Sequence, residues 1–117
     1  MVIDDDLLIA RLLSHWLGQR GYEVEIAKNG RQALEHLENG PPPSLILLDI
    51  MMPFADGFEV LTQIRAHKKW KRVPIIMLTS KSNESSVVRA FEAGADDYVT
   101  KPFKPAELMV RMNRLMK

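Results

Sequence analysis

The sequence contains no cysteine. This absence excludes disulfides, thiol nucleophiles, zinc sites with thiolate ligands and iron–sulfur clusters, and it fits a reducing compartment. No apolar run approaches the roughly 20 residues of a membrane-spanning helix, and the first residues do not have the pattern of a signal peptide. We therefore expect a cytoplasmic protein without a membrane segment.

An excess of charge of one sign is also lacking. The 16 Lys and Arg residues nearly balance the 15 Asp and Glu residues, for a formal net charge of +1, which gives no overall support for binding nucleic acid or an acidic membrane. The one basic cluster with an aromatic residue is 68–72 (KKWKR). Nucleic-acid binding needs a basic stripe or groove rather than one loop, so we interpret 68–72 as a solvated loop and expect no direct nucleic-acid binding.

Short β-rich runs alternate with segments whose apolar residues recur every three or four positions, a pattern typical of alternating strands and helices. The predicted strands are residues 2–3, 22–27, 45–48, 73–78 and 98–100. The predicted helices contain the apolar positions of 8–17, 33–37, 58–64, 87–91 and 108–115, with Gly21, Gly40 and Gly94 after the first, second and fourth of them and Pro105 in the first turn of the last.

This order predicts an α/β fold with a parallel sheet covered by helices on both faces, because each crossover must be right-handed. Residues 45–48 and 75–78 are apolar throughout, as expected for strands buried on both faces, whereas 22–26 alternate like an edge strand. Five strands fit the flavodoxin-like order 2-1-3-4-5 in a three-layer sandwich, whose ligand crevice lies beyond the carboxyl ends of strands 1 and 3.

Acidic residues follow the two strands that border this crevice: Asp4, Asp5 and Asp6 follow the first strand, and Asp49 follows the third. Helix capping accounts for one of them, and we assign that role to Asp6. Two unit charges about 4 Å apart repel by about 4 kcal/mol at an effective dielectric near 20, so the remaining cluster favours a bound cation. The alternative is a capped, salt-bridged rim without a metal ion. Oxygen ligands without Cys or His select a hard dication such as Mg²⁺, which commonly binds phosphate oxygens as well.

The other strand ends add a hydroxyl pair and an ammonium. The fourth strand ends in Thr79-Ser80, and the fifth leads into Lys101-Pro102. Neither a P-loop nor a dinucleotide glycine motif is present, and there is no serine nucleophile elbow. A phosphatase with an aspartate nucleophile would need a second aspartate as general acid two residues after Asp49, where the sequence has Met51. A site that accepts a phosphoryl group and holds it is therefore the better interpretation.

Five motifs in this order make the chain resemble the receiver domains of two-component response regulators, of the chemotaxis-regulator type, over essentially its whole length. The motifs are residues 3–6 (IDDD), 47–53 (LLDIMMP), 56–57 (DG), 77–80 (MLTS) and 93–103 (AGADDYVTKPF). By this resemblance residues 1–117 form one receiver domain. We expect it to be trimmed at both ends, because only three residues precede the acidic cluster and Lys117 falls inside the last predicted helix.

The resemblance implies a role for each residue at the strand ends. Asp49 would be the phosphoacceptor for a sensor histidine kinase or phosphotransfer protein. Asp5, Asp49 and the backbone carbonyl of Met51 would bind Mg²⁺ directly, and Asp4 would bind it through water. Lys101, before a cis Pro102, would pair with the phosphoryl group. On phosphorylation, Thr79 would move toward that group and Tyr98 would turn inward, two changes that define the switch.

The same resemblance implies what lies around the switch. The surface made by 87–91, 98–100 and 108–115 would change, would control an output domain or target protein, and would be a possible homodimer interface. Such a domain is not an enzyme beyond its own phosphotransfer and self-dephosphorylation. We expect the self-dephosphorylation to be slow, because Met51 and Lys81 flank the path of the water that would hydrolyse the acyl phosphate and Met51 offers that water no hydrogen bond. The alternative is a pseudo-receiver, the same fold acting as an interaction module without phosphorylation, although Asp4, Asp5, Asp49, Thr79 and Lys101 are all present.

Overall fold

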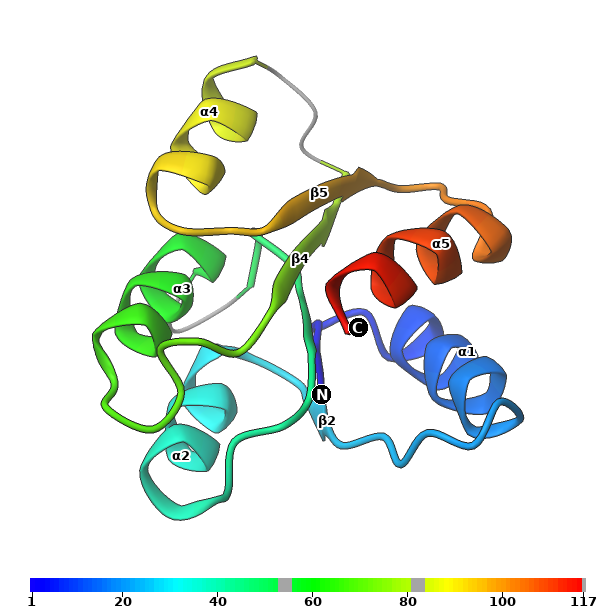
Figure 1. Cartoon of the computed structure of the whole chain (residues 1–117), viewed down its shortest axis with the longest axis horizontal. Coiled ribbons are helices and arrows are strands. Elements are labelled where there is room, and N and C mark those ends of the chain that lie inside the picture. Colours follow the sequence, from blue (N-terminus) through cyan, green and yellow to red (C-terminus); the bar gives the residue numbers. More distant parts are fainter. Residues whose placement is uncertain (53–55, 81–83, 117) are drawn as a thin grey trace.

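A parallel β-sheet with helices on both faces organises the molecule (Figure 1). The computed structural model describes residues 1–52, 56–80 and 84–116; Pro53 and Lys81, which the sequence analysis names, and Lys117 lie outside this part. Its strands are β1 (Val2–Ile3), β2 (Ile26–Ala27), β3 (Ile46–Leu48), β4 (Ile75–Thr79) and β5 (Asp97–Thr100). They are all parallel and follow the order β2-β1-β3-β4-β5, so the predicted topology is confirmed.

The helices cover both faces of this sheet, which gives the predicted three layers. They are α1 (Leu7–Gly18), α2 (Gly30–Asn39), α3 (Gly57–Ala66), α4 (Glu84–Glu92) and α5 (Pro105–Leu115). α1 and α5 lie on one face, and α2, α3 and α4 lie on the other (Figure 1). In the described part of the chain, none of these helices has the length and apolar character needed to cross a membrane.

The two faces of the sheet have separate hydrophobic cores, and the side chains of β3 and β4 alternate between them. Ile46 and Leu48 belong to the core under α2 to α4, whereas Leu47 belongs to the core under α1 and α5. In β4, Ile75 and Ile76 divide in the same way. Successive side chains of a strand point to opposite faces, so a central strand that is covered on both sides must be apolar at every position.

Strand β2 is shorter than the predicted 22–27. Only Ile26 and Ala27 pair with the sheet, each with one residue of the two-residue strand β1. An additional hydrogen bond joins the Val2 amide to the Glu25 carbonyl at 2.8 Å. An edge strand can extend only as far as its single neighbour, so the length of β1 limits β2.

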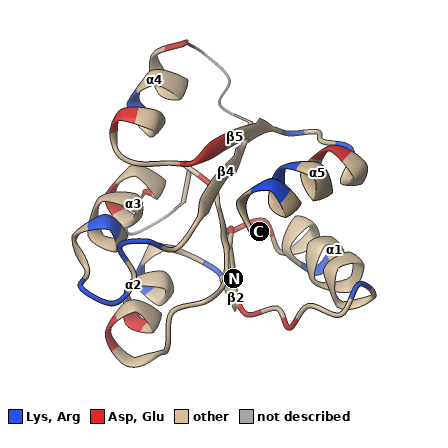
Figure 2. Cartoon of the chain, viewed as in Figure 1, with Lys and Arg blue, Asp and Glu red and all other residues tan. Residues whose placement is uncertain are grey.

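The start of β5 is held by ion pairs on both sides of the sheet, as Figure 2 shows for the acidic segment beside the basic residues of α5. The carboxylate of Asp97 is buried and accepts hydrogen bonds from Arg111 at 2.9 Å and Arg114 at 3.2 Å. The neighbouring Asp96 carboxylate accepts one from Arg65 of α3 at 2.8 Å. These contacts fix the strand that leads to Lys101.

The basic loop 68–72 differs from the prediction in one residue. Its lysines and arginine are exposed, and Figure 2 shows the loop in blue between α3 and β4. Trp70, however, is only 1% exposed and belongs to the core under α2 to α4. The expectation of a solvated loop is therefore wrong for Trp70, and its ring is not available to stack on a base.

Candidate functional site

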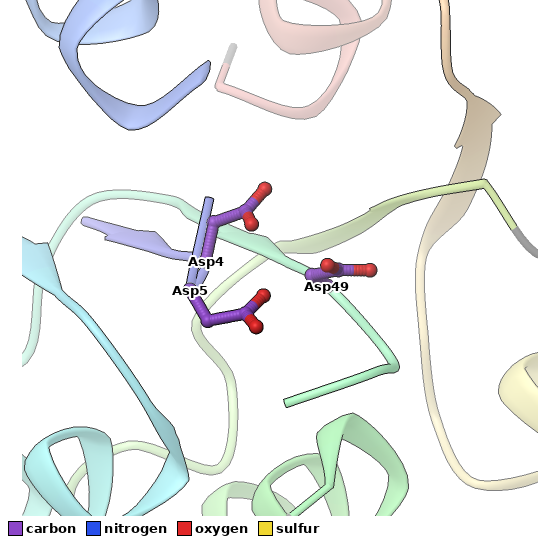
Figure 3. Close-up of side chains that lie close together, drawn as sticks. All are labelled: Asp4, Asp5 and Asp49. Atoms are coloured by element: carbon purple, nitrogen blue, oxygen red, sulfur yellow. The ribbon is translucent and has the colours of Figure 1, made fainter. Parts of the chain in front are cut away.

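Three carboxylates from two neighbouring strands meet at one edge of the sheet. Asp4 and Asp5 directly follow β1, and Asp49 directly follows β3. Each of the three offers an oxygen atom that lies within 4.8 Å of the other two (Figure 3). They meet because β1 and β3 are adjacent and parallel, so their carboxyl ends lie at the same edge.

Burial separates the roles of the consecutive aspartates. Asp4 is 1% exposed and Asp49 is 7% exposed, whereas Asp5 faces solvent. Asp6 caps α1: its Oδ1 atom accepts hydrogen bonds from the backbone amides of the second and third helical residues at 3.1 and 3.4 Å. Its own amide donates to Oδ1 of Asp4 at 2.9 Å. The predicted cap is confirmed, and it leaves the other three carboxylates for the site.

Lys101 brings an ammonium into the carboxylate cluster from the end of β5. Its Nζ atom lies 2.6 Å from Oδ2 of Asp4 and 3.5 Å from Oδ2 of Asp49. The Lys101 amide donates to the Thr79 carbonyl at 2.9 Å, and the peptide bond to Pro102 is cis, as the resemblance implied. The sequence placed Lys101 on the correct rim, but its pairing with Asp4 depends on the side-chain conformation and was not predicted.

The electrostatics of the cluster follow from burial and from this ammonium. Burial raises the pKa of Asp4, while hydrogen bonds from Lys101 and from the Asp6 amide oppose that rise. Burial acts against the charge of Lys101, but the hydrogen bond to Asp4 and the charges of Asp4 and Asp49 outweigh it and raise the pKa of Lys101. Lys101 therefore stays charged, and three carboxyl groups share this one ammonium, a formal excess of two negative charges.

The two residues predicted to form the switch lie on β4 and β5, beside this cluster. Thr79 is the last residue of β4 and is fully buried. Tyr98 is partly buried and packs against the core under α2 to α4. Within the described residues its buried hydroxyl has no hydrogen-bond partner. Burial and, to a smaller extent, the charge of Asp49 raise the pKa of Tyr98.

The loop after Asp49 leads into α3. Met51, whose backbone carbonyl is a predicted metal ligand, has an exposed side chain (57%); the role of its carbonyl stays a prediction. The Gly57 amide, at the start of α3, donates to the Ile50 carbonyl at 2.7 Å. The sequence analysis named Gly57 only as part of a motif; the available signal for this contact was a glycine directly after a helix-capping aspartate.

The donor set of the site fits a hard divalent cation. Carboxylate oxygens are the ligands that Mg²⁺ prefers, and one or two carboxylates with water suffice to hold it. Two excess negative charges remain after Lys101 is counted, which matches the charge of one such ion. Asp5 is the exposed member of the group, so the carboxylate cluster is accessible to a cation from solvent.

Comparison with known proteins identifies the family to which this chain is similar. The family model described as "Response regulator receiver domain" matches residues 1–113. The transcriptional regulatory protein SrrA of Staphylococcus aureus is 43% identical over 118 residues, which cover 100% of this chain and 47% of SrrA. The chain therefore spans about half the length of the curated relatives it matches.

Solved structures agree with this match. A CheY-like receiver domain protein from Methanospirillum hungatei is 34% identical, with a TM-score of 0.89 and coverage of 98% of this chain and 90% of that one. The response regulator TrrA from Thermotoga maritima, crystallised in complex with Mg²⁺-BeF, is 39% identical, with a TM-score of 0.84 and coverage of 97% and 95%. By its sequence, its fold and these relatives, the chain belongs to the CheY-like response regulator receiver domains of two-component signalling.

Proposed function

We propose that this chain is a phosphorylation-dependent switch in which Asp49 accepts a phosphoryl group in a Mg²⁺-dependent reaction. Receiver domains are phosphoacceptors and not enzymes in the usual sense. The observation that carries the proposal is the group of Asp4, Asp5 and Asp49 oxygens within 4.8 Å, with the Lys101 ammonium 2.6 Å from Asp4. A structural ion would need neither the exposed carboxylate nor the lysine.

The reaction requires little from the protein beyond positioning and charge. A carboxylate oxygen of Asp49 attacks the phosphorus of a phosphohistidine, the P–N bond breaks, and the histidine nitrogen leaves with the electron pair and takes up a proton. Asp4 and Asp5 would hold Mg²⁺ together with Asp49, with Met51 contributing its carbonyl. When bound, the ion supplies positive charge to the transferring phosphoryl oxygens. Lys101 would move from Asp4 toward the new phosphoryl group.

The acyl phosphate would be read out through Thr79 and Tyr98. The modification adds about −1.5 to −2 charges at one point, and Thr79, at the adjacent strand end, would donate a hydrogen bond to it. Shifting a two-state surface from 1:99 to 99:1 takes about 5.5 kcal/mol. A few charge-assisted hydrogen bonds of about 1.5–3 kcal/mol each are of that size.

The surface that changes would be the one formed by α4, β5 and α5. It exposes Val88 and Phe91 of α4 (46% each) and Val110 of α5 (68%), which suits a partner or a second copy of the chain. We propose a sensor histidine kinase or phosphotransfer protein as the phosphoryl donor in the cytoplasm. Since the chain covers 47% of SrrA, the controlled output would be a second domain or another protein.

Intact-mass measurement after incubation with acetyl phosphate tests this proposal. We expect a gain of one phosphate that requires Mg²⁺ and disappears when the metal is chelated. Absence of any gain in the folded protein would contradict the proposal and favour the pseudo-receiver alternative. Steady release of inorganic phosphate from ordinary phosphomonoesters would contradict it in favour of a phosphatase.

Replacing Met51 by asparagine should shorten the lifetime of the acyl phosphate several-fold. The exposed thioether offers an attacking water no good hydrogen bond, whereas an amide can orient water. The lifetime is measured by intact mass after the acetyl phosphate is removed. Met51→Leu keeps a similar volume without an amide and should leave the lifetime near that of the wild type. An unchanged lifetime in Met51→Asn would show that Met51 does not control hydrolysis.

A further inference from the structure

The first residue of α3 lies directly against the backbone of the acceptor residue. A Cβ atom built on Gly57 would lie 2.2 Å from the carbonyl oxygen of Asp49 and 2.7 Å from Cα of Ile50. These distances are below any contact that real side chains make, and the opposing atoms are main chain, which cannot rotate away. By contrast, a Cβ built on Gly18 of α1 meets nothing within 4 Å.

Hydrogen bonds fix Gly57 in this place. Its amide donates to the Ile50 carbonyl at 2.7 Å. Asp56 caps the helix, because its Oδ1 atom accepts a hydrogen bond from the Glu59 amide at 2.9 Å. A main-chain hydrogen bond therefore joins the start of α3 to the residue after Asp49, which belongs to the acceptor loop (residues 49–52). The Asp56 cap stabilises the first turn of the helix.

The packing of α3 prevents the helix from moving away. Phe58 and Leu61, on its first turns, are buried in the core under α2 to α4. The guanidinium of Arg89, from α4, lies 4.0 Å from the centroid of the Phe58 ring and covers its outer side. On the opposite side the Asp49 amide donates to the Ile3 carbonyl of β1 at 3.0 Å. The Asp49 main chain is thus held between β1 and the start of α3.

We propose that Gly57 is a positioning residue for the acceptor: the missing side chain lets α3 begin against the Asp49 carbonyl, and this contact sets the Asp49 carboxylate relative to Asp4 and Asp5. The role in phosphorylation rests on the proposed function, whereas the role in cation binding does not. Because α3 is held by its packing, adding a methyl group must displace the Asp49–Ile50 main chain, and this shift moves the Asp49 carboxylate away from Asp4 and Asp5.

The test is Gly57→Ala, with two matched controls. Gly18→Ala makes the same substitution in a helix where the methyl group has room, and Leu37→Ala removes a buried side chain of α2 to destabilise the fold without touching the acceptor loop. We expect Gly57→Ala to raise the Mg²⁺ dissociation constant, measured by NMR titration of backbone amides, at least tenfold. Labelling by acetyl phosphate should slow by a similar factor, and both controls should stay within twofold of the wild type.

Two outcomes of this experiment would overturn the proposal. A Gly57→Ala protein that is folded and binds Mg²⁺ within twofold of the wild type would overturn the proposal, as would an equal loss in Leu37→Ala. If Gly57→Ala does not fold, the unaltered protein decides: the NMR coupling across the Gly57–Ile50 hydrogen bond should persist when Mg²⁺ and beryllofluoride are added, and its loss would overturn the proposal. If the wild type binds Mg²⁺ but is never labelled, the proposed function fails and the titration still tests Gly57.

Discussion

Asp49→Asn should abolish labelling by acetyl phosphate, with no phosphate-sized mass gain above background after an incubation that labels the wild type fully. The amide has nearly the same shape as the carboxylate but lacks the anionic oxygen that attacks phosphorus. Asp4 remains, but it is buried and already pairs with Lys101 at 2.6 Å. Asp5 remains as well, on the neighbouring strand end, where the proposed function assigns it to the cation and not to the phosphoryl group.

Asp6→Asn is the matched control for this experiment. It makes the same chemical change next to Asp5, and asparagine caps helices about as well as aspartate, so α1 should keep its cap and labelling should be unchanged. A phosphate gain that survives in Asp49→Asn would contradict the assignment. Peptide mapping of the label would then identify the carboxylate that accepts the group.

Trp70→Ala should lower the free energy of unfolding by about 3–5 kcal/mol, the usual cost of removing a large buried aromatic side chain. Trp70 is 1% exposed and is among the largest fully buried side chains in the described part of the chain. Small domains have a total stability of about 5–15 kcal/mol, so this single change removes a large share. Urea denaturation followed by circular dichroism measures the difference.

Two further variants in residues 68–72 test whether the loss of stability comes from the buried ring of Trp70. Trp70→Phe retains part of the ring volume and removes an indole N–H that has no hydrogen-bond partner among the described residues, so it should cost clearly less than Trp70→Ala. Lys69→Ala changes an exposed neighbour and should shift stability by at most about 0.5 kcal/mol. A loss below 1 kcal/mol in Trp70→Ala would contradict the assignment of Trp70 to the core.

The central strands and the acidic rim were predictable from the sequence because local pattern and global position agree there. Residues 46–48 are apolar at every position, as expected for a strand that is buried on both faces. Asp4 and Asp49 follow such strands directly, so the parallel arrangement alone brings them together. No knowledge of side-chain conformation was needed for either prediction.

The residues that were predicted less well depend on packing between distant segments. Trp70 stands among four basic residues and has the local pattern of a surface loop. Its ring is nevertheless buried in the core under α2 to α4. The contact between Lys101 and Asp4 depends on side-chain conformation. The steric limit at Gly57 depends on where α3 meets the Asp49 main chain, which periodicity does not specify.

The pairing of Asp4 with Lys101 joins residues 97 positions apart. The carboxylate cluster therefore combines residues that follow β1 and β5, and Asp49 lies between them in the sequence. During synthesis, a chain that has already produced Asp49 but not β5 lacks the ammonium and one wall of the site. Under the proposed function, incomplete chains and proteolytic fragments that end before β5 should therefore not be labelled by acetyl phosphate, even though they contain Asp49.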